Sequence, residues 1–370
     1  MQESINEQRP EKIFADVKEV EITRAIAKEF YSVLQERAEC DVIIIGAGPA
    51  GLTAARELSL MGYKILVIEQ NNYLGGGYWL GGFMMNPVTV RAPAQKIWDE
   101  LGIPYKKVGD GLYLTPGPHA VSKLIAATCD AGVKFLNLTK FDDLVLRHGR
   151  VAGVVVNWMP VSALPRNITC VDPIALEAKM IIDASGHDSV AVKRLVDRNM
   201  IEWKGMNPMW VENGEEHVVE KTGEVFPGLV IAGMSVTETH GLARMGPTFG
   251  SMLYSGKKAA EITDQKIKEF DRKIPKKVWL NVSKIFLYDE PAVQEIQISN
   301  LKNLLLETFP VHVEIRECIF NDLDEKTVEK ISGCRIFDPK LPFKKHQPDR
   351  REIDFEKSVC KNTKLMEKTT

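Results

Sequence analysis

Apolar side chains recur along the first two-thirds of the chain with periods that predict alternating helices and strands. One helical stripe begins near the N-terminus, where apolar residues repeat every three or four positions from Ile22 to Leu34. Short continuous apolar runs are typical of strands buried in a sheet. We therefore expect strands at residues 42–45, 133–157 (two arms turning at 148–150), 179–184 and 229–236, and helices at 50–61, 91–103, 119–131 and 250–267.

Two glycine-rich stretches interrupt this pattern. Residues 74–86 contain five glycines among aromatic and apolar residues, and a second stretch runs from Gly241 to Gly250. Neither a helix nor a strand favours so many glycines, so we expect loops whose backbone closely approaches another group.

The pattern changes after residue 268. Two strands (277–289 and 310–320) and two helices (291–309 and 322–333) predict a small α/β appendage over 268–338, and the charged residues 339–370 predict a disordered tail. The fold class is thus α/β, with a main domain over 1–267 that contains an inserted β-rich region, followed by the appendage.

Composition excludes several classes of function. The 370 residues carry 48 basic and 50 acidic side chains, a balance that favours neither nucleic acid nor an anionic membrane as a partner. No apolar run is long enough to span a bilayer, and the polar N-terminus does not resemble a secretory signal. The six cysteines form no C-x-x-C pair, so we expect a reduced, cytoplasmic protein.

The first candidate site is a nucleotide fingerprint. Gly46, Gly48 and Gly51 follow the apolar strand and open the next helix, whose N-terminus favours a pyrophosphate. Glu69 ends the following strand, where a carboxylate suits a ribose hydroxyl. This arrangement predicts that the domain over 1–267 is a Rossmann-like dinucleotide-binding domain whose inserted β-rich region serves the substrate, but the glycines alone do not separate NAD from FAD.

Three further segments carry candidate chemistry. In an extended segment Cys170 and Asp172 would face the same way, because side chains alternate along a strand. The sequence Gly-His-Asp at 186–188 follows a buried strand, where sites commonly form in α/β sheets. The third segment is the glycine-rich stretch with Arg244, preceded by Met234.

Taken together, these motifs resemble the thiazole synthases of the eukaryotic and archaeal thiamine pathway, up to about residue 265. The resemblance implies that NAD is cleaved to release nicotinamide and that its ADP-ribose part condenses with glycine. Addition of sulfur then gives ADP-5-ethyl-4-methylthiazole-2-carboxylate in an iron(II)-dependent reaction. The shared motifs are EITRAI at 21–26, DVIIIGAGPAGL at 41–52, GGGYWLGG at 75–82, CVDP at 170–173, GHD at 186–188 and ARMGPTFG at 243–250.

The resemblance also implies residue roles. Arg244 would bind the carboxylate of glycine, and Asp172 and His187 would bind iron. A neighbouring protomer would complete the site, which implies a homo-oligomer, commonly an octamer. The residues expected to contact NAD are Gly46, Gly48, Ala50, Gly51, Glu69, Gln70, Gly77, Phe141 and Met234; Ala50 stands where the family usually has Ser.

Cys170 decides the expected source of sulfur. Family members with Cys at this position donate its sulfur and are left with dehydroalanine, whereas those with His use sulfide and turn over. This chain has Cys170, so we expect a single-turnover synthase, with catalytic use of sulfide as the alternative. Two other hypotheses are an FAD-dependent oxidoreductase and a non-enzymatic nucleotide-binding scaffold. The family lacks the segment after residue 268, and no function is assigned to it.

Overall fold

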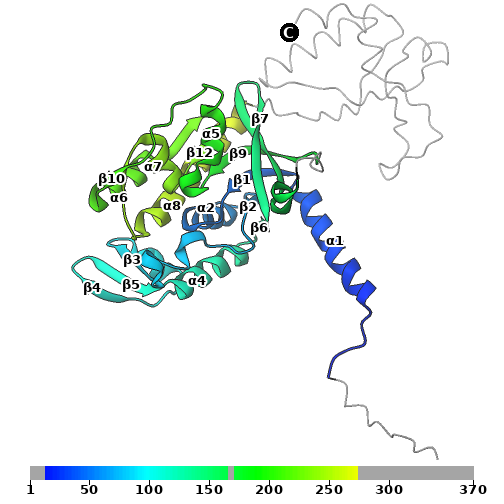
Figure 1. Ribbon diagram of the computed structural model, residues 1–370, viewed down its shortest axis with the longest axis horizontal. Coiled ribbons are helices and arrows are strands. Elements are labelled where there is room, and N and C mark those ends of the chain that lie inside the picture. The colour runs from blue at the N-terminus through cyan, green and yellow to red at the C-terminus, as the bar shows by residue number, and fades with distance from the viewer. Residues whose placement is uncertain (1–12, 166–170, 274–370) are drawn as a thin grey trace, which may run out of the picture. The chain divides into compact units, whose positions relative to one another are not determined.

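The computed structural model describes residues 13–165 and 171–273 of the chain, a mixed α/β domain with a parallel, Rossmann-like core (Figure 1). Residue contacts divide the chain into two units, Met1–Glu269 and Phe270–Thr370. The predicted elements at 277–333 and the predicted tail at 339–370 lie outside the described residues. None of the described helices is both long enough and apolar enough to cross a membrane.

The central sheet grows from the predicted strand–glycine turn–helix–strand unit. Its middle strand, β1, is flanked by β2 and β9, and both pairings are parallel. β6 and β12 extend the parallel sheet on either side, and β11 closes one edge in the antiparallel direction. Parallel strands place their carboxyl ends along one edge, where ligands bind in such sheets. The strands are β1 (Glu39–Ile45), β2 (Ile65–Ile68), β6 (Lys134–Leu136), β9 (Ile174–Asp183), β11 (Gly223–Phe226) and β12 (Leu229–Ile231).

Three of the four longest described helices, α2, α4 and α8, bury apolar side chains in this core. The first turn of α2 lies so close to α8 that a side chain on Gly256 would contact the carbonyl oxygen of Ala50. The predicted helical stripe forms α1, whose apolar residues Ile22 and Ile26 stay exposed. The helices are α1 (Glu19–Arg37), α2 (Pro49–Leu60), α4 (Gly117–Asp130) and α8 (Gly250–Lys273).

The predicted strand–turn–strand forms the hairpin of β7 (Thr139–Arg147) and β8 (Arg150–Trp158). β8 pairs with the first half of β9, and β1 and β12 pair with the second half. β9 therefore belongs to two pairings in succession, and it starts five residues before the predicted strand at 179–184. Its first half alternates in burial and lacks the continuous apolar run that marks its second half.

The expected helix at 91–103 exists but is shorter than predicted. Only α3 (Gln95–Glu100) is helical there, and the preceding residues form β3 (Pro87–Arg91). β3 pairs with β5 (Leu112–Pro116), which also pairs with β4 (Lys106–Gly109), in a separate antiparallel sheet. Figure 1 shows this small sheet beside α4, apart from the central sheet.

The apolar run at 229–236 is also not one strand. β12 ends at Ile231, Gly233 takes a left-handed φ of 65°, and α7 begins at Met234. The chain changes direction at Gly233. A positive φ is readily adopted by glycine and is strained for other residues, so glycine permits the turn here. The remaining elements are α5 (Val190–Val196), α6 (Val211–Lys221), α7 (Met234–His240), β10 (Asn207–Met209), β13 (Ala243–Arg244) and short 3-10 turns at Gly76–Tyr78, Gly82–Met84, Met159–Ala163 and Gly186–Asp188.

Candidate active site

The glycine turn after β1 has the backbone geometry that the fingerprint predicts. Gly46 has a left-handed φ of 96°, and a Cβ there would lie 2.6 Å from the carbonyl oxygen of Ala184. A Cβ on Gly51 would overlap the carbonyl oxygen of Gly46, so this glycine lets the helix close onto the turn. Around the Cβ direction of Gly48 there is open space. The turn therefore leaves room for a ligand at the N-terminus of α2.

Glu69, directly after β2, is buried, with an exposed fraction of 6%. Its Oε2 accepts a hydrogen bond from the backbone N–H of Ala47 at 2.9 Å. Its Oε1 accepts two bonds of 2.8 Å from the backbone and side chain of Asn71. A carboxylate offers about four acceptor positions. Glu69 thus ties the glycine turn to the end of β2 and retains capacity for one further donor.

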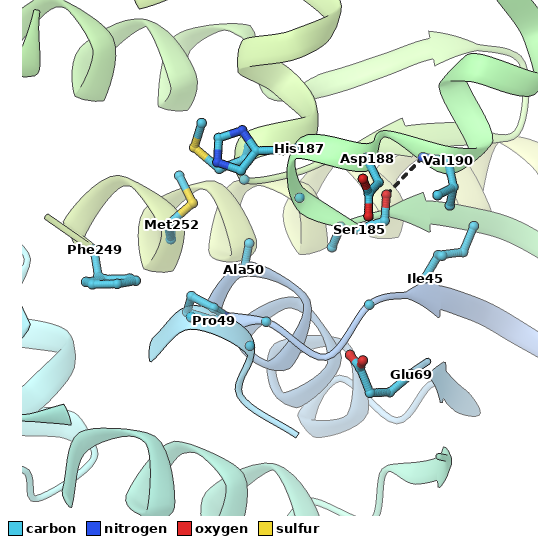
Figure 2. Close-up of a pocket in the computed structure, with 18 of the residues that line it drawn as sticks. Ile45, Pro49, Ala50, Glu69, Ser185, His187, Asp188, Val190, Phe249 and Met252 are labelled. Carbon is cyan, nitrogen blue, oxygen red and sulfur yellow. Dashed lines mark hydrogen bonds between the residues drawn. The ribbon is translucent and has the colours of Figure 1, made fainter. Parts of the chain in front are cut away.

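A cavity of about 670 Å³ lies over the carboxyl ends of the central strands. Sites for small molecules and cofactors have volumes of about 300–1,000 Å³. Figure 2 shows two sides of this cavity. Pro49 and Ala50 of α2 lie on one side, and His187 and Met252 lie on the other. Ten of the residues predicted from sequence line the cavity: Gly46, Gly48, Ala50, Glu69, Gln70, Gly77, Phe141, His187, Met234 and Arg244.

Asp183 anchors the turn that carries the Gly-His-Asp motif. Its side chain is fully buried at the end of β9. Oδ2 accepts bonds from the backbone N–H groups of Ala191 and Val192, the second and third residues of α5 (2.9 and 3.2 Å). Oδ1 accepts bonds from the backbone and hydroxyl of Ser185 and from the hydroxyl of Ser235. A carboxylate at a helix N-terminus also interacts favourably with the helix dipole.

His187 projects from this turn toward the cavity (Figure 2), and its side chain is about half exposed, at 54%. Its Nδ1 lies 3.1 Å from Oε1 of Glu238, which is nearly buried in α7. Sequence reasoning did not select Glu238, Asp183 or Ser235. From sequence alone, an acidic residue in a short polar helix is expected to be a solvated charge. In addition, no local spacing connects Glu238 to a motif 51 residues earlier in the chain.

Arg244 lies in β13, which pairs with β10, and its exposed side chain lines the cavity. The segment after it is fixed by Glu215 of α6. This buried carboxylate accepts bonds from the Thr248 hydroxyl (3.0 Å) and the Ser251 backbone (3.3 Å), and it forms an ion pair with Arg91 (3.0 Å). A guanidinium suits a carboxylate ligand because it can donate two parallel hydrogen bonds.

Two of the predicted residues that the structure describes, Gly51 and Asp172, do not line the cavity. Gly51 lies behind the glycine turn, where it serves packing. Cys170 lies outside the described residues. Asp172 is exposed just before β9 begins, whereas His187 follows the other end of this strand. A strand of 10 residues spans roughly 30 Å when straight. Within one protomer, Asp172 and His187 therefore cannot bind the same metal ion.

The described residues of one protomer do not form a complete metal site. Residues 13–165 and 171–273 contain no cluster of three or more His, Cys, Asp or Glu side chains that could hold an ion. His187 nevertheless fits the role of a ligand, because metal-binding histidines usually donate their second ring N–H to a carboxylate or carbonyl. An imidazole nitrogen and a carboxylate oxygen are suitable donors for iron(II).

Comparison with known proteins agrees with the family resemblance that the motifs carry. The model of the Thi4 family matches residues 23–249, which is more than half of the chain. The chain belongs to the Thi4 family. A thiamine thiazole synthase of Aeropyrum pernix is 57% identical over 255 residues, covering 69% of this chain and 94% of the relative. One from Thermococcus kodakarensis is 41% identical over 245 residues, covering 66% and 96%.

A solved structure supports this family fold. The crystal structure of Thermovibrio ammonificans THI4 is 36% identical, with a TM-score of 0.66, and the match covers 69% of this chain and 100% of that chain. The Thi4 match ends before the C-terminal segment. A second family model, described as "Probable metallopeptidase family (DUF6775)", matches residues 281–370.

Proposed function

We propose that this Thi4 chain makes the thiazole of thiamine from NAD and glycine, with release of nicotinamide. Thiamine thiazole biosynthesis is supported by the family match and by the names of the relatives. The observation that carries the substrate proposal is one cavity lined both by the glycine turn with Glu69 and by Arg244. A dinucleotide and a small carboxylate could therefore lie side by side in it.

The residues of the chain divide the work by their chemistry. The glycine turn and the N-terminus of α2 would hold the pyrophosphate, and Glu69 would accept a ribose hydroxyl, which disfavours a 2′-phosphate. The guanidinium of Arg244 would hold the carboxylate of glycine. These contacts would orient the amino group of glycine toward the ribose end of the nucleotide.

Cys170 is the proposed sulfur donor. Its thiolate would attack an electrophilic carbon of the ADP-ribose–glycine intermediate, forming a C–S bond. The Cβ–S bond of the cysteine would then break as its α-proton leaves. The sulfur would stay in the product, and residue 170 would become dehydroalanine, which ends catalysis after one turnover.

Iron(II) is the proposed metal, with His187 and Asp172 as its protein ligands. Bound there, iron would supply a Lewis acid beside the reacting groups. Because Asp172 and His187 lie beyond opposite ends of β9, we propose that each ion is shared between two protomers. Cys170, two residues from Asp172, would then also serve the site of the neighbouring copy.

The surface of α1 supports a homo-oligomer, for which an octamer is our proposal. Several apolar side chains on and before this helix are at least 44% exposed, which is typical of an interaction face. They are Ile13, Phe14, Val17, Val20, Ile22, Ile26, Phe30 and Tyr31.

The C-terminal segment, residues 281–370, matches a family described as a probable metallopeptidase family. Residues 281–370 contain no His-Glu-x-x-His sequence, which in many metallopeptidases places two zinc-binding imidazoles on one helix face. We therefore propose no peptidase function for this segment.

Mass spectrometry of the intact protein tests the sulfur proposal. After reaction with NAD, glycine and iron(II), we expect a population lighter by one H₂S, with the loss localised to Cys170. Cys170→Ala should bind NAD but form no thiazole, whereas Cys129→Ala, at an exposed position on α4, should behave as the native protein. Thiazole formation by Cys170→Ala with added sulfide would favour the sulfide-dependent alternative. Product without sulfide would refute the donor role.

A further inference from the structure

We infer that Glu238 is a positioning residue that fixes the tautomer and orientation of His187, so that Nε2 is the nitrogen offered to a metal in the cavity. The inference rests on the proposed metal-binding role of His187. Its structural basis is the 3.1 Å contact between Nδ1 of His187 and Oε1 of Glu238.

The chemistry of this contact selects one tautomer. An ionised carboxylate can only accept hydrogen bonds, so Nδ1 of His187 must carry the proton in this arrangement. The lone pair of the neutral ring then lies on Nε2, across the ring from Glu238. A metal ligand requires such a lone pair, and the hydrogen bond at the other nitrogen determines which nitrogen has it.

Burial makes Glu238 an effective support. Its side chain is 10% exposed, against 54% for the side chain of His187. The carboxylate is therefore held by packing within α7, whereas the imidazole is free to contact a ligand. A hydrogen bond to a carboxylate in such surroundings is less screened by water than one at the surface.

The same helix face also holds the backbone of the motif. The hydroxyl of Ser235, one helical turn before Glu238, lies 3.2 Å from the carbonyl oxygen of Gly186 and 3.1 Å from Oδ1 of Asp183. Residues three apart on a helix share one face. α7 therefore contacts the turn at its backbone through Ser235 and at its side chain through Glu238, so the same helix positions both the motif and its imidazole.

The tautomer can be measured without metal or substrate. In solid-state NMR of the full chain labelled with ¹⁵N-histidine, at mildly alkaline pH, comparison with His187→Gln identifies the His187 signals among the seven histidines. We expect protonated Nδ1 and unprotonated Nε2 in the native protein, and a loss of this preference in Glu238→Leu. A native His187 with its proton mainly on Nε2 would overturn the inference, whatever the fate of the iron proposal.

Metal affinity gives the second readout. Titration with iron(II) without oxygen, or with cobalt(II) followed by its absorption spectrum, should show about 10–100-fold weaker binding in Glu238→Leu. Glu238→Gln, whose carbonyl can still accept from Nδ1, should recover most of the affinity. The control is Glu216→Leu, which removes an exposed carboxylate on α6 and should bind as the native protein. Unchanged affinity in Glu238→Leu, alongside weaker binding in His187→Gln, would overturn the inference. Equal affinity in native protein and His187→Gln would instead refute the metal-binding role itself.

Discussion

Replacement of Asp183 by Asn tests whether the turn that presents His187 depends on one buried charge. The two side chains have nearly the same shape, so the change leaves packing intact. The carboxylate of Asp183 accepts five hydrogen bonds, three at Oδ1 and two at Oδ2. The asparagine amide has only one acceptor oxygen. Its NH₂ group would occupy the position of the other carboxylate oxygen, where it would face hydrogen-bond donors that it cannot accept from.

The expected loss of unfolding free energy follows from the number of hydrogen-bond donors that lose their acceptor in Asp183→Asn. If the NH₂ group takes the Oδ2 position, the backbone N–H groups of Ala191 and Val192 lose theirs. If it takes the Oδ1 position, the two serine hydroxyls can rotate, and only the backbone N–H of Ser185 is left without a partner. One unsatisfied buried donor costs about 1–3 kcal/mol, and the remaining bonds lose their charge assistance, so we expect about 3 kcal/mol in total.

Thermal unfolding measures this loss. For a body of about 250 residues, the average unfolding entropy converts 3 kcal/mol into a Tm lower by roughly 6 °C. Asp197→Asn, at the exposed C-terminus of α5, is the matched control and should change the unfolding free energy by less than about 0.5 kcal/mol. An Asp183→Asn protein with a Tm within about 1 °C of the native value would refute the anchoring role of the charge.

Two further predictions concern a thiol and the assembly. Burial raises the pKa of Cys40 to about 12, so its stabilising contribution should be present below pH 9 and lost as the pH rises toward 12. Iodoacetamide at pH 8 should therefore modify the exposed Cys129 but not Cys40 in the folded protein, as peptide mapping would show. Oligomers reassembled from inactive Asp172→Ala and inactive His187→Ala chains should regain thiazole formation, because some sites combine the intact residue of each. Mixed oligomers no more active than either parent would argue against a site shared between protomers.

The core of the fold could be predicted because it depends on local patterns. β1, the glycine turn and α2 follow from a buried run, the spacing of three glycines and a helical period, all within residues 39–60. The small sheet of β3, β4 and β5 was missed because its strands are short and its burial is only partial. Alternation of Val88 and Val90 was the signal that could have identified β3.

The residues of the candidate site also differ in how far local sequence patterns could predict them. Residues proposed to contact a ligand, such as Gly48 and Arg244, belong to recognisable sequence segments, and they line the cavity. Residues that hold other residues, such as Glu238 and Glu215, form contacts 51 and 124 positions away in the chain. No local pattern encodes such contacts, since an acidic side chain in an amphipathic helix is usually solvated.

The length of β9 determines whether Asp172 and His187 can meet within one protomer or only between two protomers. Fifteen positions would bring two residues near each other if the chain between them formed a hairpin. Here a single strand of 10 residues, β9, fills most of the interval, and its pairing with β8, β1 and β12 keeps it extended. If both residues bind the proposed metal ion, Asp172 must therefore come from a second copy, because the extended strand separates it from His187 within one chain.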